Sequence, residues 1–291
     1  MTADYKRLPG NTIELHITFP WSEIKTVYDR IFALVLAEVE LPGFRKGKAP
    51  KELAVKQVNP TKIYEEVLKE MVPYAYAQAV KQHNLQPIIS PKVEVLEASE
   101  NKDWKLKVST CEKPHISLGN YKQAVTKIKQ SKKTKIWTPG SPKEEPNKDE
   151  LTLGEVLDAI ASEIKVELSE LILEQEVNRL LSNLINETQK LGLTVEQYLQ
   201  SQGKTNEQLR RDYKSQAQKT LSLEFALEEI AEVEKITVEP SEIESVIANA
   251  KDPQEKKTLE SERYYIGSLL RRQKALASLM QSEITTIDTA K

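Results

Sequence analysis

The chain has 291 residues, a length typical of two domains, and its 39% hydrophobic and 30% charged residues are typical of a soluble, largely helical protein. Its net charge of −2 excludes a protein that binds polyanions over its whole surface, so any nucleic-acid contact must be local. A single cysteine excludes an internal disulfide and a zinc site built from cysteines, and suits a reducing cytosol, while the lack of about 18 consecutive apolar residues predicts no membrane-spanning helix.

The chain begins with a pattern of strand and then helix. Residues 11–19 alternate apolar and polar side chains, which predicts a half-buried strand. An amphipathic helix is expected after Pro20, with Ser22 as its N-cap. A second, short helix is expected around residues 51–57.

The remainder of the first domain predicts a long helix and a hairpin. The helix is expected to begin with Asn59 as its N-cap and Pro60 in its first turn. Pro73, inside the helix, should bend it. Two runs of alternating side chains, at about 87–97 and 103–112, are separated by a polar turn and predict two paired strands.

Residues 41–51 read Leu-Pro-Gly-Phe-Arg-Lys-Gly-Lys-Ala-Pro-Lys, and their glycines and prolines exclude a regular helix or a central strand. A glycine-hinged loop with an aromatic side chain beside several cations suits RNA, because Arg and Lys meet phosphate while Phe stacks. The alternative is a solvated surface loop in which Phe44 folds back onto the core. Composition alone favours this alternative, since most basic loops are simply solvated.

The same loop resembles the ribosome-docking loop of the trigger factor family, bacterial chaperones that meet nascent chains at the ribosomal exit tunnel. The family motif G-F-R-x-G-x-x-P is matched at every fixed position and lies between two helical segments, as it does in the family. The resemblance implies a ribosome-binding domain over residues 1–117. It also implies a set of ribosome-binding residues, namely Gly43, Phe44, Arg45, Lys46, Gly47, Lys48 and Pro50.

Residues 118–150 predict a linker. Within this range, residues 129–149 are rich in lysine, proline and charge and have too little apolar surface to form a core. Their lysines would either be solvated in a tether, which is favoured, or touch RNA. In the trigger factor family a prolyl isomerase domain of the FKBP type usually follows here, but residues 151 onward have no strands for it. The resemblance is therefore to a shortened form that lacks this domain.

Residues 151–291 predict an all-helical domain with amphipathic helices over 151–165 and from Val166 to just before Gly192. Further helix starts, the first two of them capping boxes, are expected at Thr194, Thr205, Pro240 and Asp252. Residues 166–246 resemble the start of the family's chaperone domain, whose helices form arms that cradle unfolded polypeptide.

The apolar stripes of these helices, taken alone, are more typical of a helix–helix core than of a client surface. Client-binding residues are therefore not assigned. The aromatic residues of this part are expected at or beside core positions; they are Tyr198, Tyr213, Phe225, Tyr264 and Tyr265.

No sequence pattern indicates catalysis. The chain has no Walker loop, G-x-G-x-x-G, H-E-x-x-H or G-x-S-x-G, and His16, His83 and His115 lack metal-ligand spacing. We therefore expect no catalytic residues, no metal and no cofactor.

Together these patterns predict an α+β protein: an α/β ribosome-binding domain, a linker and a helical chaperone domain. The resemblance implies a cytoplasmic, ATP-independent chaperone that holds nascent chains. Its partners would be unfolded polypeptides and the ribosome, through ribosomal protein and rRNA at the tunnel exit. No membrane partner is expected, and a homodimer is left open. The alternatives are a ribosome-binding factor without clients and a peptidyl-prolyl isomerase like the full-length family members.

Overall fold

The computed structural model describes residues 1–38, 59–133, 152–250 and 252–281. The chain forms two compact units. Unit 1 comprises Met1–Lys113 together with Ser169–Ile172, and unit 2 comprises Pro114–Leu168 together with Leu173–Lys291. Among the helices of the ranges above, none is long and apolar enough to cross a membrane.

Unit 1 is built on a four-stranded antiparallel sheet with the strand order β1-β2-β4-β3. The strands are β1 (Thr2–Leu8), β2 (Thr12–Phe19), β3 (Lys92–Glu97) and β4 (Trp104–Cys111). The three strands predicted from alternating side chains are present. The strand β1 was not predicted, because most of its side chains are exposed and it lacks an apolar alternation.

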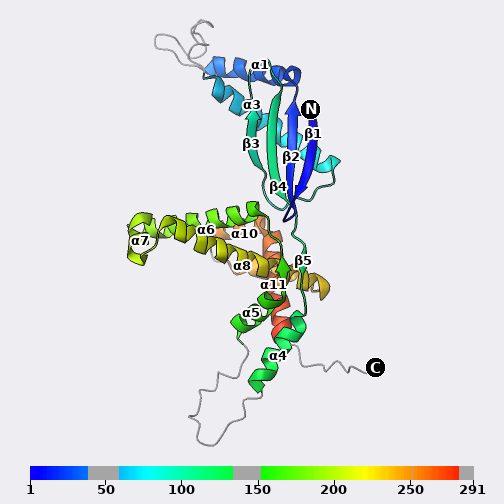
Figure 1. The fold of residues 1–291 in the computed structure, drawn as a ribbon, viewed down its shortest axis with the longest axis vertical. Coiled ribbons are helices and arrows are strands. Elements are labelled where there is room, and N and C mark those ends of the chain that lie inside the picture. The colour runs from blue at the N-terminus through cyan, green and yellow to red at the C-terminus, as the bar shows by residue number, and fades with distance from the viewer. Residues whose placement is uncertain (39–58, 134–151, 251, 282–291) are drawn as a thin grey trace, which may run out of the picture. The chain divides into compact units, whose positions relative to one another are not determined.

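Two helices, α1 (Trp21–Glu38) and α3 (Pro60–Gln82), cover one face of this sheet (Figure 1). Inward side chains of β2 and β4 meet them in a single core, whose largest fully buried members include Trp104, Ile13, Leu15, Ile17, Ile24, Ile63 and Leu106. As predicted, Asn59 caps α3, accepting a hydrogen bond from the Thr61 amide. Ser22 is not the N-cap of α1, because that helix already begins at Trp21, and the short helix expected at 51–57 lies outside the described residues.

Unit 2 begins at Pro114 and includes the stretch that was predicted as a linker. Residues 118–150 were predicted as a linker, yet α4 (Tyr121–Lys133) is a helix in which Tyr121 and Val125 are buried. These side chains pack against α5 (Leu153–Glu163), together with the partly buried Ala124 and Ile128. Four apolar residues among the lysines are therefore enough to pack the helix onto the rest of unit 2. The linker prediction was therefore wrong for residues 121–133, and residues 134–151 lie outside the described part of the chain.

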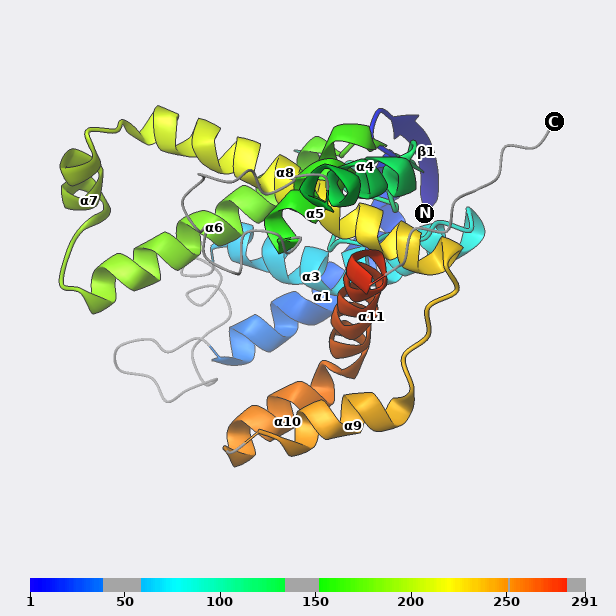
Figure 2. The same ribbon diagram turned by 90° about the horizontal axis from the view of Figure 1, so that it is seen from below.

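The helices that follow make two hairpin-like groups in unit 2. The elements are α6 (Glu170–Lys190), α7 (Val195–Gln202), α8 (Asn206–Val233), α9 (Pro240–Ala248), α10 (Pro253–Ser261) and α11 (Arg263–Gln281). Figure 2 shows α6 and α8 joined at one end by α7, and α9 beside α10 ahead of α11. The helix predicted from Asp252 is interrupted at Glu262, which separates α10 from α11.

Unit 2 is not purely helical, since the two-residue strands β5 (Ile116–Ser117) and β6 (Lys165–Val166) pair with each other. They close a small core in which α4, α5, α8 and α11 meet. The first turn of α6 belongs to unit 1, where the Ser169 hydroxyl lies 2.7 Å from the Thr12 hydroxyl.

Candidate functional site

The predicted ribosome-docking residues all lie within residues 39–58, outside the described residues. They are Gly43, Phe44, Arg45, Lys46, Gly47, Lys48 and Pro50. Their assignment stays a prediction. The structure does describe the two helices that flank this segment, α1 before it and α3 after it.

The two flanking helices are fixed to each other and to the sheet by aromatic contacts. The Tyr64 ring centroid lies 5.9 Å from that of Tyr28 on α1 and 5.0 Å from that of Trp104 on β4. Burial raises the pKa of the Tyr28 and Tyr64 hydroxyls, which therefore stay neutral at physiological pH. Arg30 on α1 also pairs with Glu70 on α3. Residues 39–58 are thus connected at both ends to a packed pair of helices.

A second candidate surface lies at the end of the α6–α8 hairpin. Thr194 and Thr205 cap α7 and α8 with the predicted capping boxes, and Gly203 ends α7 at φ 63°. A small cluster of Leu184, Leu199 and Leu209 joins the three helices. This end of the hairpin is therefore held by its own caps and its own core.

Large apolar side chains remain exposed next to that cluster and on the α9–α11 group. On the first hairpin, Leu191 is 75% exposed and Leu193 42% exposed. On α11, Tyr264 is 92% exposed and Tyr265 58% exposed, which corrects their prediction as core aromatics. Helical spacing places a side chain on a face of its helix but does not say whether a neighbour covers that face.

The remaining predicted aromatics behave as expected. Tyr198 and Tyr213 are partly buried and pack against the small leucine cluster of the hairpin. Phe225 on α8 is also partly buried. These positions support the helix periodicity read from the sequence.

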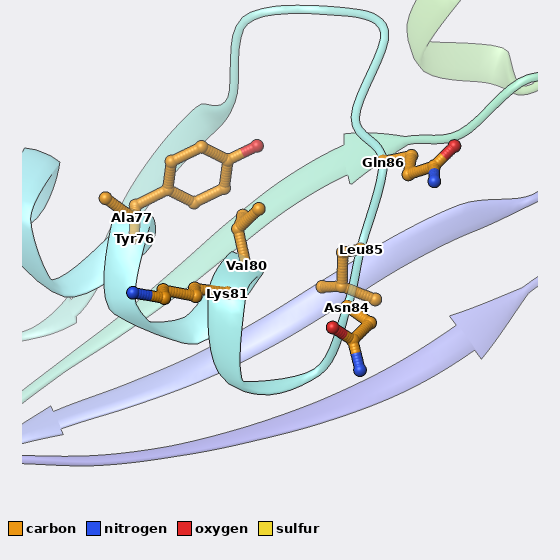
Figure 3. Close-up of a pocket in the computed structure, with 7 residues that line it drawn as sticks. All are labelled: Tyr76, Ala77, Val80, Lys81, Asn84, Leu85 and Gln86. Atoms are coloured by element: carbon orange, nitrogen blue, oxygen red, sulfur yellow. The ribbon is translucent and has the colours of Figure 1, made fainter.

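A shallow groove of about 500 Å³ lies at the end of α3 in unit 1. Figure 3 shows its side chains coming from α3 and from the segment that follows the helix. The lining residues are Tyr76, Ala77, Val80, Lys81, Asn84, Leu85 and Gln86. Burial raises the pKa of the Tyr76 hydroxyl, so this side chain lines the groove in its neutral form at physiological pH.

The outer strand β3 borders unit 1 with apolar side chains that remain exposed. Val93 is 40% exposed and Val95 50% exposed, although their partners on β4, Val108 and Leu106, are fully buried. Leu96 is also more than half exposed. Sequence reasoning assigned Val93 and Val95 to a strand but could not show that the helices stop short of them.

The His, Cys, Asp and Glu side chains of the described residues do not form a metal-binding group. Within those residues no group of three His, Cys, Asp or Glu side chains could hold a metal ion. His16 is exposed and pairs with Glu14 at 2.8 Å. Cys111 is buried, and burial raises the pKa of its thiol to about 11, so it is protonated and unreactive at neutral pH.

Two family models match the chain and together span nearly all of it. One, described as "Bacterial trigger factor protein (TF)", matches residues 1–136, and the other, described as its C-terminus, matches residues 138–281. The two matches are separated by a single residue.

Several trigger factors from other bacteria are similar to the chain in sequence. That of Lactococcus lactis subsp. lactis (strain IL1403) is 32% identical over 132 residues, which is 45% of this chain and 31% of the relative. That of Pelotomaculum thermopropionicum is 34% identical over 123 residues, or 42% of this chain and 28% of the relative. The matched region thus spans less than a third of the length of these relatives.

A solved structure is similar in fold. It comes from work on "Promiscuous Substrate Recognition in Folding and Assembly Activities of the Trigger Factor Chaperone" and covers 97% of this chain and 100% of its own, with a TM-score of 0.62 at 14% identity. This similarity confirms the α+β fold class. At 14% identity, the structural similarity is evidence for the fold and not for a function.

Proposed function

Because the chain belongs to the trigger factor family, we propose that it is a ribosome-associated, ATP-independent chaperone that holds nascent polypeptides at the exit tunnel. The observation that carries the proposal is the pair of adjacent family matches, which together run from residue 1 to residue 281. The proposal includes a cytoplasmic location and two functional parts, a ribosome-binding domain over 1–117 and a chaperone domain over 151–291.

The proposed ribosome contact is the loop with the motif G-F-R-x-G-x-x-P. Phe44 would stack or insert, while Arg45 and Lys46 would meet phosphate of rRNA beside ribosomal protein. The packed pair of α1 and α3 supports this assignment, since a loop carried by fixed helices presents its side chains with less loss of entropy on binding.

The proposed client surface is the set of exposed apolar side chains on the helical arms, including Leu191, Leu193 and Tyr264. Exposed apolar patches bind unfolded chains by burying the apolar surface of both partners. Weak contact at several separate places lets a client leave and fold. The ribosome contact raises the local concentration of nascent chains near these surfaces.

Co-sedimentation with ribosomes tests the loop assignment. Replacing Phe44, Arg45 and Lys46 by alanine should weaken binding at least tenfold while the thermal unfolding curve stays unchanged. The matched control replaces Leu34, Lys25 and Lys62, which are exposed on α1 and α3, and so removes the same charge and a similar apolar side chain. Equal binding by the wild type and the loop variant would rule out this site.

Suppression of aggregation tests the client surface. The purified chain should slow the aggregation of a chemically unfolded protein without nucleotide, and replacing Leu191 and Leu193 by serine should reduce this effect. Leu153→Ser is the control, because Leu153 is 51% exposed but lies on α5 outside the arms. No suppression by the wild type at molar excess would favour a ribosome-binding factor without clients.

We also propose that the chain is not an enzyme. The proposal is supported by family matches to N- and C-terminal domains that leave one residue between them. A proline-limited refolding step, which takes tens of seconds without catalysis, should therefore keep its rate when the chain is added. Acceleration of that step by a preparation free of other isomerases would make the chain a peptidyl-prolyl isomerase.

A further inference from the structure

A groove of unit 2 lies between the end of α5 with β6 on one side and the middle of α8 on the other. Its volume is about 500 Å³, which is usual for a cleft that binds a ligand. Both walls belong to unit 2, where α5 and α8 share one core through Ile160 and Leu227. The groove is therefore a feature of a single packed unit.

One wall of the groove is a polar face of α8. Four of its side chains are spaced by three and four residues and so lie on the same side of the helix; they are Ser215, Gln218, Lys219 and Ser222. Other helix serines of the chain donate their hydroxyl to a carbonyl one turn earlier, as Ser162 and Ser245 do. Neither Ser215 nor Ser222 has such a bond to another described residue. Both hydroxyls are thus available to a ligand.

The rest of the lining is largely apolar. Ile164, Val166 and Leu223 line the groove, and each is partly exposed. The strand β6 is held by its pairing with β5, and the Ile164 amide donates a 3.1 Å hydrogen bond to the Ile160 carbonyl at the end of α5. This apolar wall is formed before a ligand binds, which reduces the entropy lost on binding.

The charges that line the groove are positive. Lys165 and Lys219 contribute them, and none of the described lining residues carries a carboxylate. Lys165 is exposed and has no ion pair with another described residue. Lys219 pairs with Asp158 at 2.9 Å, but these side chains are 62% and 69% exposed, and such exposed pairs contribute little to stability. A carboxylate that enters the groove can therefore meet Lys165 directly and compete with Asp158 for Lys219.

We propose that this groove binds a short acidic and apolar segment of an unfolded polypeptide, with a carboxylate beside Lys165 and Lys219 and an apolar side chain against Ile164 and Val166. The inference rests on the proposed chaperone function and deepens it, because it names a class of client segment that unit 2 selects. It differs from the exposed side chains of the arms, for which apolar contact alone is proposed.

Matched peptide probes test the chemistry of the occupant. Each probe is a short fluorescent peptide in which leucine alternates with glutamate or with glutamine, and its binding to the full chain is followed by anisotropy. The glutamate probe should bind about tenfold more tightly, because hydrogen bonds to charged groups are stronger than neutral ones, and this advantage should shrink as salt is added. Equal affinities of the two probes would overturn the proposal. A glutamate probe with serine in place of leucine that binds equally well would also overturn it.

Charge variants place the carboxylate at the two lysines. Lys165→Glu should weaken binding of the glutamate probe at least tenfold, because it replaces an attraction by a repulsion. Lys256→Glu is the matched control, since it makes the same change of charge at an exposed lysine of α10. Asp158→Asn should strengthen binding about threefold, because it releases Lys219 from its exposed pair. Equal binding by the two lysine variants, or no gain with Asp158→Asn, would refute the assignment.

A change of shape tests the groove without a change of charge. Ser215→Trp fills the groove at an exposed position of α8 and should weaken binding at least tenfold while the thermal unfolding curve stays unchanged. Ser245→Trp, at an exposed position of α9, is the control for the added indole ring. If Ser215→Trp binds the glutamate probe as tightly as the wild type does, the peptide lies outside the groove and the proposal is wrong.

Aggregation assays run in parallel separate this inference from the proposed function. Suppression of aggregation by a wild type that does not distinguish the two probes would leave the function standing and refute the acidic groove. Selective binding of the glutamate probe without suppression would support the groove as a peptide site and refute the chaperone function.

Discussion

Replacing Tyr121 by phenylalanine tests whether α4 is a structural part of unit 2. Tyr121 is 5% exposed, and its hydroxyl donates a 2.8 Å hydrogen bond to Oε1 of Glu234 just after α8. Lys122 reaches the same carboxylate oxygen at 2.6 Å. The hydrogen bond from Lys122, and to a smaller extent the one from Tyr121, holds the pKa of Glu234 below its usual range. One carboxylate therefore connects the start of α4 to the end of α8.

The size of the effect follows from the partners of this hydrogen bond. A hydrogen bond to a charged group contributes about 1.5–3 kcal/mol to stability. The lower end applies here, because the Glu234 side chain is 30% exposed and keeps its bond to Lys122. Phenylalanine keeps the ring in the core, so Tyr121→Phe should lower the free energy of unfolding of unit 2 by about 1.5 kcal/mol.

Urea unfolding followed by circular dichroism measures this loss, and Tyr264→Phe is the control because Tyr264 is almost fully exposed. The loss should be roughly halved once the pH has fallen below the lowered pKa of Glu234, because the carboxylate is then protonated and hydrogen bonds to charged groups are about twice as strong as neutral ones. An unchanged midpoint at pH 7 would mean that the hydrogen bond to Glu234 does not stabilise the packing of α4 in unit 2.

Three further outcomes are expected. Gly119→Ala should lower the free energy of unfolding by more than about 2 kcal/mol, because Gly119 has φ 54° and a Cβ there would lie 2.6 Å from a backbone oxygen. Gly203→Ala is also at positive φ but in open space, and should lower it by about 1 kcal/mol. Equal urea midpoints of the two variants would contradict this. Lysine hydrogen bonds lower the pKa of Glu94 and Glu97, so their contribution to stability is complete above the ordinary pKa of 4.5 and is lost as the pH falls through their lowered pKa. A urea midpoint that does not fall as the pH is lowered below 4.5 would refute this. Limited trypsin digestion should cut first within residues 134–149, which the sequence predicts as a linker, and a first cut within α8 would show that this division is wrong.

The elements with strong local signals could be predicted from the sequence. Alternation gave β2 and the hairpin of β3 and β4, and hydrogen-bonding side chains gave the starts of α3, α7 and α8. These signals depend on neighbours within a few residues. The family resemblance added the fold class, since it used residues spread over both units.

The errors arose where distant partners decide the structure. Tyr121 and Val125 lie in a lysine-rich stretch, and they are buried only because α5, α8 and α11 complete a core around them. Tyr264 has helical spacing, but it is 92% exposed, so no described residue covers its side chain. The proposed client surface is likewise defined by what does not pack on its exposed apolar side chains, and a pattern of side chains along the chain does not contain this information.

The hydroxyl contact between Thr12 and Ser169 has a consequence for the order in which the chain folds as it is synthesised. Lys113 completes the first segment of unit 1, but Ser169–Ile172 leave the ribosome roughly 55 residues later, after about 3–11 s at usual rates of translation. During that time the sheet can form, but Thr12 and the buried Cys111 do not yet have the Ser169 hydroxyl as a hydrogen-bond partner. Unit 1 of this proposed nascent-chain chaperone is thus completed only after a later segment of its own chain, Ser169–Ile172, has been synthesised.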